Sequence, residues 1–399
     1  MNVLFCRIFQ FFMKLGYYLI PVRTPETITG EGCVLRLAQP LCDRGVTHPL
    51  VVTDGGLSKL GLPDGMVESL RVAGLSVTVY DGVQPNPTDA DVEEGVRLYR
   101  EAGCDGIIAF GGGSPMDCAK AIGARIVRPR KLIARLQGLF GVLHRLPPFF
   151  AVPTTAGTGS ETTLAAVITD NATHHKASIN DPSLIPHVAV LDPALTMGLP
   201  PAITAATGMD ALCHAVEAYT NHTYCTRLEN RMAKEAVRLI RQYLLRAYEN
   251  GSDQEARQMM QRAAFCAGRA FTRGCVGNVH AAGHTLSALY GVAHGQAMAA
   301  LLPKVLRMYG SKVNHRLAAL AEECGYTGTD AEKAEALIGW IEEMNARMQL
   351  PDAFPMIQDK DIPQMCRWAM AEANPVYPVP QVWGEKQFRQ LFETARKNS

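Results

Sequence analysis

The chain has 399 residues, 47% of them apolar, and its 39 Lys and Arg residues nearly balance its 38 Asp and Glu residues, for a net charge of +1. This length allows two domains of ordinary size, and the balanced charge argues against a nucleic-acid-binding protein with a global basic surface. The eleven cysteines form no C-x-x-C pair, which indicates neither a zinc ribbon nor a disulfide framework, so we expect a reducing, cytoplasmic environment.

Residues 1–20 form an apolar extension that is predicted to be helical. One broad face of this helix is apolar and carries Leu4, Ile8, Phe11, Leu15 and Tyr18. The opposite face is polar and carries Arg7, Gln10 and Lys14. These cations interrupt the apolar block, which is atypical of a secretory signal. We expect the helix to dock on its own protein or on a partner subunit, with a weak membrane contact as the alternative.

From residue 21 to 196, short apolar runs alternate with helical periods, which predicts a parallel α/β sheet. Strands are predicted at 49–54, 75–80, 105–110, 149–153, 165–170 and 187–192. Helices are predicted at 57–73 and from Thr88 to about residue 102, where Thr88 and Asp91 have the spacing of a capping box. The basic segment 125–148 is predicted to be a surface helix with solvated charges.

From residue 197 to 399 the strand-like runs disappear, and nearly all of the sequence has helical character. Pro200 and Pro201 mark the start of the first helix of this half. We therefore predict, after the extension, an α/β domain over 21–196 and an all-helical domain over 197–399.

A glycine loop in the α/β half is typical of a nucleotide site. Gly111, Gly112 and Gly113 lie directly between a predicted strand and a predicted helix. Glycines let backbone amides approach a phosphate, and a helix N-terminus favours negative charge. Ser114 is the expected N-cap, and Asp117 has the position that completes a capping box. The alternative is a plain structural turn.

Asp54 ends the first predicted strand, where a carboxylate can accept hydrogen bonds from ribose hydroxyls and would repel a 2′-phosphate. It therefore favours NAD over NADP, and an ordinary turn with Gly55 is the alternative. The loop 154–161, T-T-A-G-T-G-S-E, follows another strand and offers hydroxyls and amides for a cofactor cleft. A simple Gly/Thr turn is the alternative there.

Histidines are concentrated in the helical half. Asp210 and His214 are four residues apart, as are His280 and His284, so each pair lies on one face of a helix. His294 follows one loop later. Three imidazoles and one carboxylate suit Zn(II) or Fe(II), and the spacing does not choose between them. A single such histidine is more often a core residue, but the repeated pairs favour a divalent-metal site.

Together these stretches resemble the iron-dependent (type III) alcohol dehydrogenase family, over nearly the whole chain from about Tyr18. The matching stretches are V-V-T-D (51–54), P-N-P-T (85–88), G-G-G-S-P-M-D (111–117), P-T-T-A-G-T-G-S-E (153–161), T-G-M-D-A-L-C-H-A-V-E (207–217) and V-H-A-A-G-H…A-H-G (279–295). The resemblance implies an N-terminal Rossmann-like dinucleotide-binding α/β domain and a C-terminal all-helical metal-binding catalytic domain. The segment after Gly123 looks shorter than in many relatives, and the apolar extension is unlike most members.

The resemblance also assigns site residues. The metal ligands are expected at Asp210, His214, His280 and His294. The contacts to NAD are expected at Asp54, Asn86, Gly112, Gly113, Ser114, Thr154, Thr155, Thr158 and Lys176. His284 matches the family's additional active-site histidine and is expected outside the ligand set, and Phe271 is expected to line the substrate cleft. The implied cofactors are NAD and Fe(II), with Zn(II) as the alternative metal.

The implied reaction is reversible hydride transfer between a primary alcohol and NAD, with the metal as Lewis acid on the substrate oxygen. His284 would relay the proton, because imidazole titrates near neutrality. The expected partners are a small alcohol or aldehyde and further copies of the chain, in a dimer or a larger homo-oligomer.

Parts of the same pattern are also compatible with other functions. A hydroxyacid dehydrogenase of the same family is one alternative. A dehydroquinate-synthase-like lyase, which also uses NAD and a metal, would need a basic cluster near the metal, and only Arg269 and Arg273 closely precede His280. A non-catalytic metal or nucleotide binder is disfavoured because all the candidate ligands are present.

Overall fold

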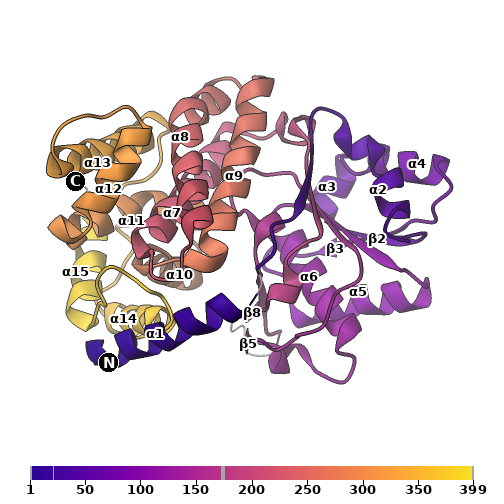
Figure 1. Cartoon of the computed structure of the whole chain (residues 1–399), viewed down its shortest axis with the longest axis horizontal. Helices are drawn as coiled ribbons and strands as arrows, with labels where there is room; N and C mark the ends of the chain where they lie inside the picture. Colours follow the sequence, from indigo (N-terminus) through magenta and orange to yellow (C-terminus); the bar gives the residue numbers. More distant parts are fainter. Residues whose placement is uncertain (1, 21, 172–175, 398–399) are drawn as a thin grey trace. The chain divides into compact units, whose positions relative to one another are not determined.

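The computed structural model describes residues 2–20, 22–171 and 176–397. The described chain forms two compact units (Figure 1). Val22–Gly198 form an α/β unit, whereas the N-terminal helix joins the residues from Leu199 onward in a helical unit. The predicted fold class, an α/β half followed by an all-helical half, is confirmed.

Among the described residues of the α/β unit, six strands form a parallel sheet in the order β1-β9-β6-β4-β2-β3. These strands are β1 (Glu26–Thr29), β2 (Pro49–Asp54), β3 (Thr78–Val83), β4 (Gly106–Gly111), β6 (Phe149–Pro153) and β9 (Val188–Leu191). A smaller sheet contains β5 (Gly138–Leu139), β8 (Lys176–Asn180) and β7 (Ala165–Thr169). The helices are α2 (Ala38–Cys42), α3 (Gly55–Lys59), α4 (Asp64–Val72), α5 (Asp89–Glu101) and α6 (Gly113–Val127).

Helices cover both faces of the six-stranded sheet. Alternate residues of each strand point to opposite faces, so they pack in two separate cores. Leu50 and Val52 pack in the core that α5 and α6 share, whereas Val51 packs in the core that contains α4. Burial on both faces explains why these strands read as continuous apolar runs in the sequence. The result is a doubly wound sheet.

The direction of winding reverses at β2, because β3 lies on one side of it and β4 on the other. In doubly wound sheets, ligands bind at the carboxyl ends of the strands where the order reverses. Asp54 ends β2 and Gly111 ends β4. The two sequence features that indicated a nucleotide therefore lie at this position of the sheet.

Several predicted elements of this unit differ in detail. The helix expected at 57–73 is interrupted and becomes α3 and α4, because Gly61 adopts a left-handed φ of 67° and Pro63 follows. The strand expected at 75–80 is shifted to Thr78–Val83. The capping box of Thr88 and Asp91 at the start of α5 is present as predicted. The sequence did not predict β1, β5 or β8.

The prediction of a surface helix over 125–148 is wrong, whereas the expected exposure of its charges holds for Arg130, Arg135 and Arg145. After α6 ends, the described segment contains only a 3-10 turn at Ile133–Arg135 and the short β5. Two of its cations bond to the segment's own backbone: Arg128 donates to the Val142 carbonyl at 2.5 Å, and Lys131 donates to the Gly141 carbonyl at 2.8 Å. Arg125, at the end of α6, pairs with Glu93 of α5.

The helical unit contains α1 (Val3–Leu19), α7 (Pro201–Asn221), α8 (Arg227–Glu249), α9 (Gln254–Gly274), α10 (Asn278–Tyr290), α11 (His294–Tyr309), α12 (Asn314–Glu323), α13 (Asp330–Arg347), α14 (Ile362–Ala373) and α15 (Glu385–Ala395). Helix α7 packs against α8, α9 and α11, and α10 packs against α11 and α14. In the described part of the chain, no helix has the length and apolar character to cross a membrane.

Helix α1 docks on its own helical unit, but in the orientation opposite to that expected of an amphipathic helix. Its buried side chains are Cys6, Gln10 and Tyr17, and its apolar face points away from the protein. The predicted division of the helix into two faces holds, yet the polar side is the one that makes the contact.

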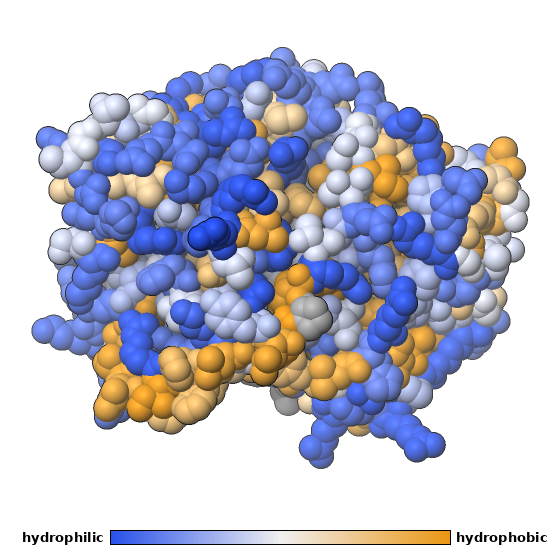
Figure 2. Space-filling view, in the orientation of Figure 1, coloured by the Kyte–Doolittle hydropathy of each residue, from blue (hydrophilic) through white to orange (hydrophobic). Residues whose placement is uncertain are grey.

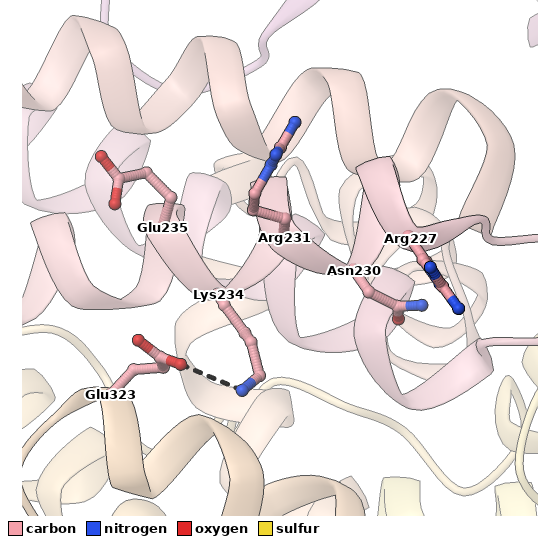
Figure 3. Close-up of a pocket in the computed structure, with 6 residues that line it drawn as sticks. All are labelled: Arg227, Asn230, Arg231, Lys234, Glu235 and Glu323. Carbon is pink, nitrogen blue, oxygen red and sulfur yellow. Dashed lines mark hydrogen bonds and ion pairs between the residues drawn. The ribbon is translucent and has the colours of Figure 1, made fainter.

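The helical unit also has a charged pocket between α8 and α12 (Figure 3). It is lined by Arg227, Asn230, Arg231, Lys234, Glu235 and Glu323. Lys234 and Glu323 pair at 2.9 Å across it. None of these six residues belongs to the predicted site, and ion pairing satisfies much of the charge, so we assign the pocket no role in chemistry.

Candidate metal centre and cofactor loops

The histidine cluster is built by three helices of the helical unit. Asp210 and His214 lie one turn apart on α7, His280 lies on α10, and His294 begins α11. The start of α11 comes very close to α7. A Cβ at Gly295 would lie 2.2 Å from the carbonyl oxygen of Ala206, so only glycine allows this approach.

One carboxylate oxygen is central to the cluster. Asp210 Oδ1 lies 3.3 Å from His294 Nε2, 3.7 Å from His280 Nε2 and 3.8 Å from His214 Nδ1. Asp210, His280 and His294 together present ligand atoms that lie within 4.8 Å of one another. The ring of His214 stacks on that of His280 with a centroid distance of 4.6 Å. The structure thus brings the four predicted ligands together.

The donor set fits a divalent metal ion. Asp210 Oδ1, His214 Nδ1 and His280 Nε2 are buried and have no hydrogen-bond partner among the described residues. Each such atom would cost roughly 1–3 kcal/mol if nothing bound it. A tetrahedral ion with bonds of about 2.1 Å sets its ligand atoms about 3.4 Å apart, close to the 3.3–3.8 Å that separate Asp210 Oδ1 from the three imidazole nitrogens. One oxygen and three nitrogens suit either Fe(II) or Zn(II).

The charge states of Asp210, His214 and His294 also suit a metal. Burial alone would raise the pKa of Asp210, but His214 and His294 hold it well below the usual value, so the carboxylate is ionised. Burial lowers the pKa of His214 to about 3 and also lowers that of His294. These two imidazoles are therefore neutral near pH 7, which is the form that binds metals.

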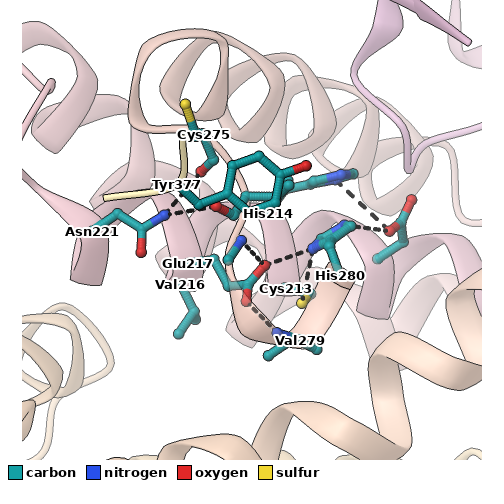
Figure 4. A network of polar contacts seen from close by, with 12 residues as sticks. Cys213, His214, Val216, Glu217, Asn221, Cys275, Val279, His280 and Tyr377 are labelled. Atoms are coloured by element: carbon teal, nitrogen blue, oxygen red, sulfur yellow. Dashed lines mark hydrogen bonds and ion pairs between the residues drawn. The ribbon is translucent and has the colours of Figure 1, made fainter. Parts of the chain in front are cut away.

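Glu217 orients His280 from behind (Figure 4). Its carboxylate accepts hydrogen bonds from the backbone amides of Gly277 and Val279, each at 2.8 Å, and lies 2.6 Å from His280 Nδ1. A proton on Nδ1 leaves Nε2 free to face Asp210, and such outer partners fix the tautomer of a ligand. No role was predicted for Glu217. Its position seven residues after Asp210, two turns along the same helix, would have indicated that both carboxylates lie on one face of α7.

His284 borders the four candidate ligands but bonds to a different carboxylate, that of Glu372. Its Nδ1 lies 2.8 Å from Glu372 Oε1, which also accepts a hydrogen bond from the Tyr377 hydroxyl at 3.1 Å. Among the histidines of this cluster, His284 is the most exposed, with 44% of its side chain accessible. Its ring stacks on His294 at 5.2 Å, so it borders the cluster. Glu372 was not predicted, because it lies 88 residues from His284 in the sequence and no local pattern links the two.

Phe271 forms an apolar wall of the same cluster. Its ring stacks on that of His214 with centroids 4.1 Å apart and an interplanar angle of 15°. An aromatic side chain at this distance restricts the imidazole to one orientation and excludes water from that side. The predicted cleft residue therefore lies next to a predicted metal ligand.

In the α/β unit, Asn86 links two other predicted cofactor contacts. It has a left-handed φ of 59°, and its backbone amide donates to Ser114 Oγ at 3.3 Å. Its side-chain oxygen accepts a hydrogen bond from Lys176 Nζ at 2.7 Å. Burial lowers the pKa of Lys176. The structure therefore groups these three residues, which lie far apart in the sequence.

Close contacts join the glycine loop to the threonine loop. Gly111 has a φ of 148°, and a Cβ there would lie 2.6 Å from Pro115. A Cβ at Gly112 would lie 3.5 Å from Thr155, and one at Gly113 would lie 3.2 Å from Thr158. The backbone of Thr154 donates to the Gly111 carbonyl at 3.1 Å. The absence of side chains on these glycines thus lets the two loops pack closely against each other.

The prediction that Ser114 caps α6 is wrong. The helix begins at Gly113, its N-cap is Gly112, and no side chain makes a capping hydrogen bond. Asp117, expected to complete a capping box, instead accepts hydrogen bonds from Ser160 Oγ and the Val167 amide, each at 3.0 Å. Without a side-chain cap, the first amides of α6 remain suited to an anion.

Asp54 has a local structural role. Its Oδ1 accepts hydrogen bonds from the amides of Gly56 at 2.9 Å and Leu57 at 3.0 Å, so it caps α3. This cap agrees with the alternative of a turn at Gly55. Both of its hydrogen bonds use Oδ1, and neither uses Oδ2. A nucleotide contact by Asp54 therefore remains a prediction.

A buried lysine fixes the end of the threonine loop. Lys120 on α6 is fully buried and donates to Ser160 Oγ at 3.0 Å and to Thr163 Oγ1 at 2.8 Å. It also donates to the carbonyls of Thr163 and Ala165. Burial lowers the pKa of Lys120 to about 8 and raises that of Glu161 to about 7. This network was not predicted from the sequence.

Comparison with known proteins identifies the family. The family model of iron-containing alcohol dehydrogenases matches residues 24–193, and that of the family's C-terminal domain matches residues 204–396. Alcohol dehydrogenase 4 of Schizosaccharomyces pombe is 37% identical, with 92% of this chain and 87% of that protein covered. The NAD-dependent methanol dehydrogenase of Bacillus methanolicus is 36% identical, with coverages of 87% and 92%.

A crystal structure of a 1,3-propanediol oxidoreductase superposes with a TM-score of 0.90 at 35% identity, covering 94% of this chain and 99% of that one. The chain belongs to the iron-containing alcohol dehydrogenase family, as the sequence motifs indicated.

Proposed function

We propose that this protein is a metal- and NAD-dependent alcohol dehydrogenase that interconverts a primary alcohol and its aldehyde. Membership of the family supports an alcohol oxidoreductase. The observation that carries the proposal is the buried carboxylate oxygen of Asp210, which faces three imidazole nitrogens and has no hydrogen-bond partner in the described chain. Such a set of donors needs a cation.

Asp210, His214, His280 and His294 would hold the metal, for which we favour Fe(II). When bound, the ion supplies a Lewis acid that polarises the substrate oxygen and favours the alkoxide. Glu217 keeps Nε2 of His280 directed at the site, and Phe271 keeps His214 in place and excludes water. One carboxylate among four ligands leaves a net positive charge for this task.

His284 would move the proton. Its Nδ1 is engaged by Glu372, so Nε2 is the atom that exchanges a proton with the alcohol hydroxyl. It accepts the proton in oxidation and returns it in reduction, as general base and general acid. Its partly exposed side chain offers the proton a route to solvent.

The α/β unit would bind NAD. The uncapped amides at the start of α6 suit the pyrophosphate, and Ser114, Asn86 and Lys176 form a polar group beside them. We assign Asp54 Oδ2 to the ribose hydroxyls, because Oδ1 already caps α3. A carboxylate at this position would repel a 2′-phosphate, which supports NAD over NADP.

An absorbance assay for NADH tests the proposal. Metal-loaded protein should reduce NAD with simple primary alcohols and oxidise NADH with the matching aldehydes. A dehydroquinate-synthase-like lyase would show no net change in NADH, and a hydroxyacid dehydrogenase would respond to hydroxyacids in preference to alcohols. Absence of NAD turnover with every primary alcohol, in protein shown to carry the metal, would contradict the proposal.

A further inference from the structure

Helix α1 presents a continuous apolar face to the outside of the helical unit. This apolar face consists of the predicted residues Leu4, Ile8, Phe11, Leu15 and Tyr18 together with Phe5, Phe12 and Leu19. Their exposed fractions range from 47% for Leu15 to 85% for Leu19. Figure 2 shows the face as an orange band at the place of α1 in Figure 1. Contiguous exposed apolar surface of this kind marks an interaction site.

The opposite side of α1 fixes it to the protein by hydrogen bonds. Gln10, which is only 2% exposed, donates to the carbonyls of Pro375 at 3.0 Å and Tyr377 at 2.9 Å. Arg7 donates to the Pro380 carbonyl at 3.1 Å. Because the polar side is held in this way, the helix lies flat on its unit and cannot turn its apolar face inward.

The C-terminal end of α1 is anchored in the same manner. The ring of Tyr17 lies 5.1 Å from that of Tyr224, and Arg273 donates to the Tyr17 carbonyl at 2.5 Å. The helix is therefore held in its middle and at its C-terminal end. Its apolar face is a fixed feature of the surface, presented by a rigid support.

We propose that this apolar face docks on the surface of a bilayer that contains anionic phospholipid. The charge of the helix supports this choice. Helix α1 contains no Asp or Glu, and its cations Arg7 and Lys14 follow one edge of the apolar face, next to Phe11 and Tyr18. Cations beside an apolar, aromatic face are typical of helices that lie in the headgroup region.

The size of the face argues against a second copy of the chain as its occupant. A helix of 17 residues is about 25 Å long, and with a width of about 10 Å its exposed face covers roughly 250–400 Å². A stable protein interface needs about 800 Å² from each partner. A bilayer has no such requirement, because apolar side chains that enter its outer 5–10 Å and nearby cations suffice.

Flotation with lipid vesicles tests the proposal on the full-length, metal-loaded protein. The vesicles are phosphatidylcholine with phosphatidylglycerol, and phosphatidylcholine alone. The variants Ile8→Glu and Phe12→Glu place a carboxylate in the apolar face, and Lys14→Gln removes one cation. Leu60→Glu is the matched control, since Leu60 is 78% exposed and lies on the α/β unit.

We expect wild type and Leu60→Glu to float with the anionic vesicles. Partition should fall at least about tenfold for Ile8→Glu and Phe12→Glu, and about fivefold for Lys14→Gln, on the anionic vesicles only. Unchanged thermal unfolding and unchanged alcohol oxidation in these variants would show that the fold survives. Flotation with either kind of vesicle measures lipid binding directly and does not depend on the proposed catalytic function.

Each of the following results would overturn the proposal. One is that wild type does not float with the anionic vesicles, and another is that Phe12→Glu floats as well as wild type. Equal flotation of wild type on both vesicle types would refute the choice of anionic lipid. Light scattering that shows a dimer lost in Phe12→Glu, together with no flotation of wild type, would assign the apolar face to a second copy of the chain.

Discussion

Replacing Lys120 by methionine tests how the α/β unit holds its cofactor loops. Methionine keeps most of the length of lysine and removes its charge and its donors. In the native protein, Nζ lies 2.8–3.0 Å from four oxygens of Ser160, Thr163 and Ala165 and shares its three N–H donors among them. The buried carboxyl of Asp117, which bonds Ser160, would lose its nearby cation.

The size of the effect follows from this network. Removing one partner from a buried charged network costs about 3–5 kcal/mol. Burial already depresses the pKa of Lys120 to about 8, so part of its desolvation cost is regained on mutation, and we take the lower end, about 3 kcal/mol. For a unit of this size, that lowers Tm by about 6–12 °C. Binding of NAD should weaken too, because Ser160 ends the loop that carries Thr154, Thr155 and Thr158.

Thermal unfolding by circular dichroism and titration of NAD by calorimetry measure the two effects. Lys59→Met is the control, because Lys59 is an exposed lysine of the same unit, and it should match wild type in both. If Lys120→Met unfolds within about 2 °C of wild type and binds NAD equally well, the network does not hold the loop and the reasoning is refuted.

Three further predictions concern single side chains. His284→Ala should retain metal and NAD but lower kcat about 10²-fold and flatten one limb of its pH profile; loss of metal would instead make His284 a ligand. Asp54→Asn keeps an N-cap acceptor for α3 and removes the charge, so the ratio of kcat/KM for NADP to that for NAD should rise; an unchanged ratio would exclude Asp54 from ribose recognition. Burial raises the pKa of Glu161 from 4.5 to about 7, so between these values the folded state binds a proton that the unfolded state lacks. Stability should therefore fall as pH rises through this window, by about 3 kcal/mol, and urea unfolding of Glu161→Gln should lack this contribution; equal pH dependence in both proteins would contradict it.

Local patterns in the sequence predicted the parts of the site that depend on local geometry. The spacing of Asp210 with His214, and of His280 with His284, places each pair on one helical face, and the structure has both helices. Asp54 was singled out because it ends an apolar run, and its strand lies at the reversal of the sheet order. Helical periodicity and strand runs are properties of short segments, so they can be read from one sequence.

Contacts between distant segments could not be predicted in this way. Lys120 meets Ser160 across 40 residues, and His284 meets Glu372 across 88. Helix α1 shows the same limit, because its two faces could be predicted from helical periodicity but the face that docks could not. That choice depends on carbonyls more than 360 residues away, at Pro375 and Tyr377, which accept from Gln10.

The metal content of the protein tests the central claim most directly. Elemental analysis of anaerobically purified wild type should find about one Fe or Zn ion per chain. His280→Ala and His294→Ala should lose most of this metal while keeping the wild-type circular dichroism, and the exposed His315→Ala should keep both metal and fold. Full metal occupancy in either His280→Ala or His294→Ala would contradict the account.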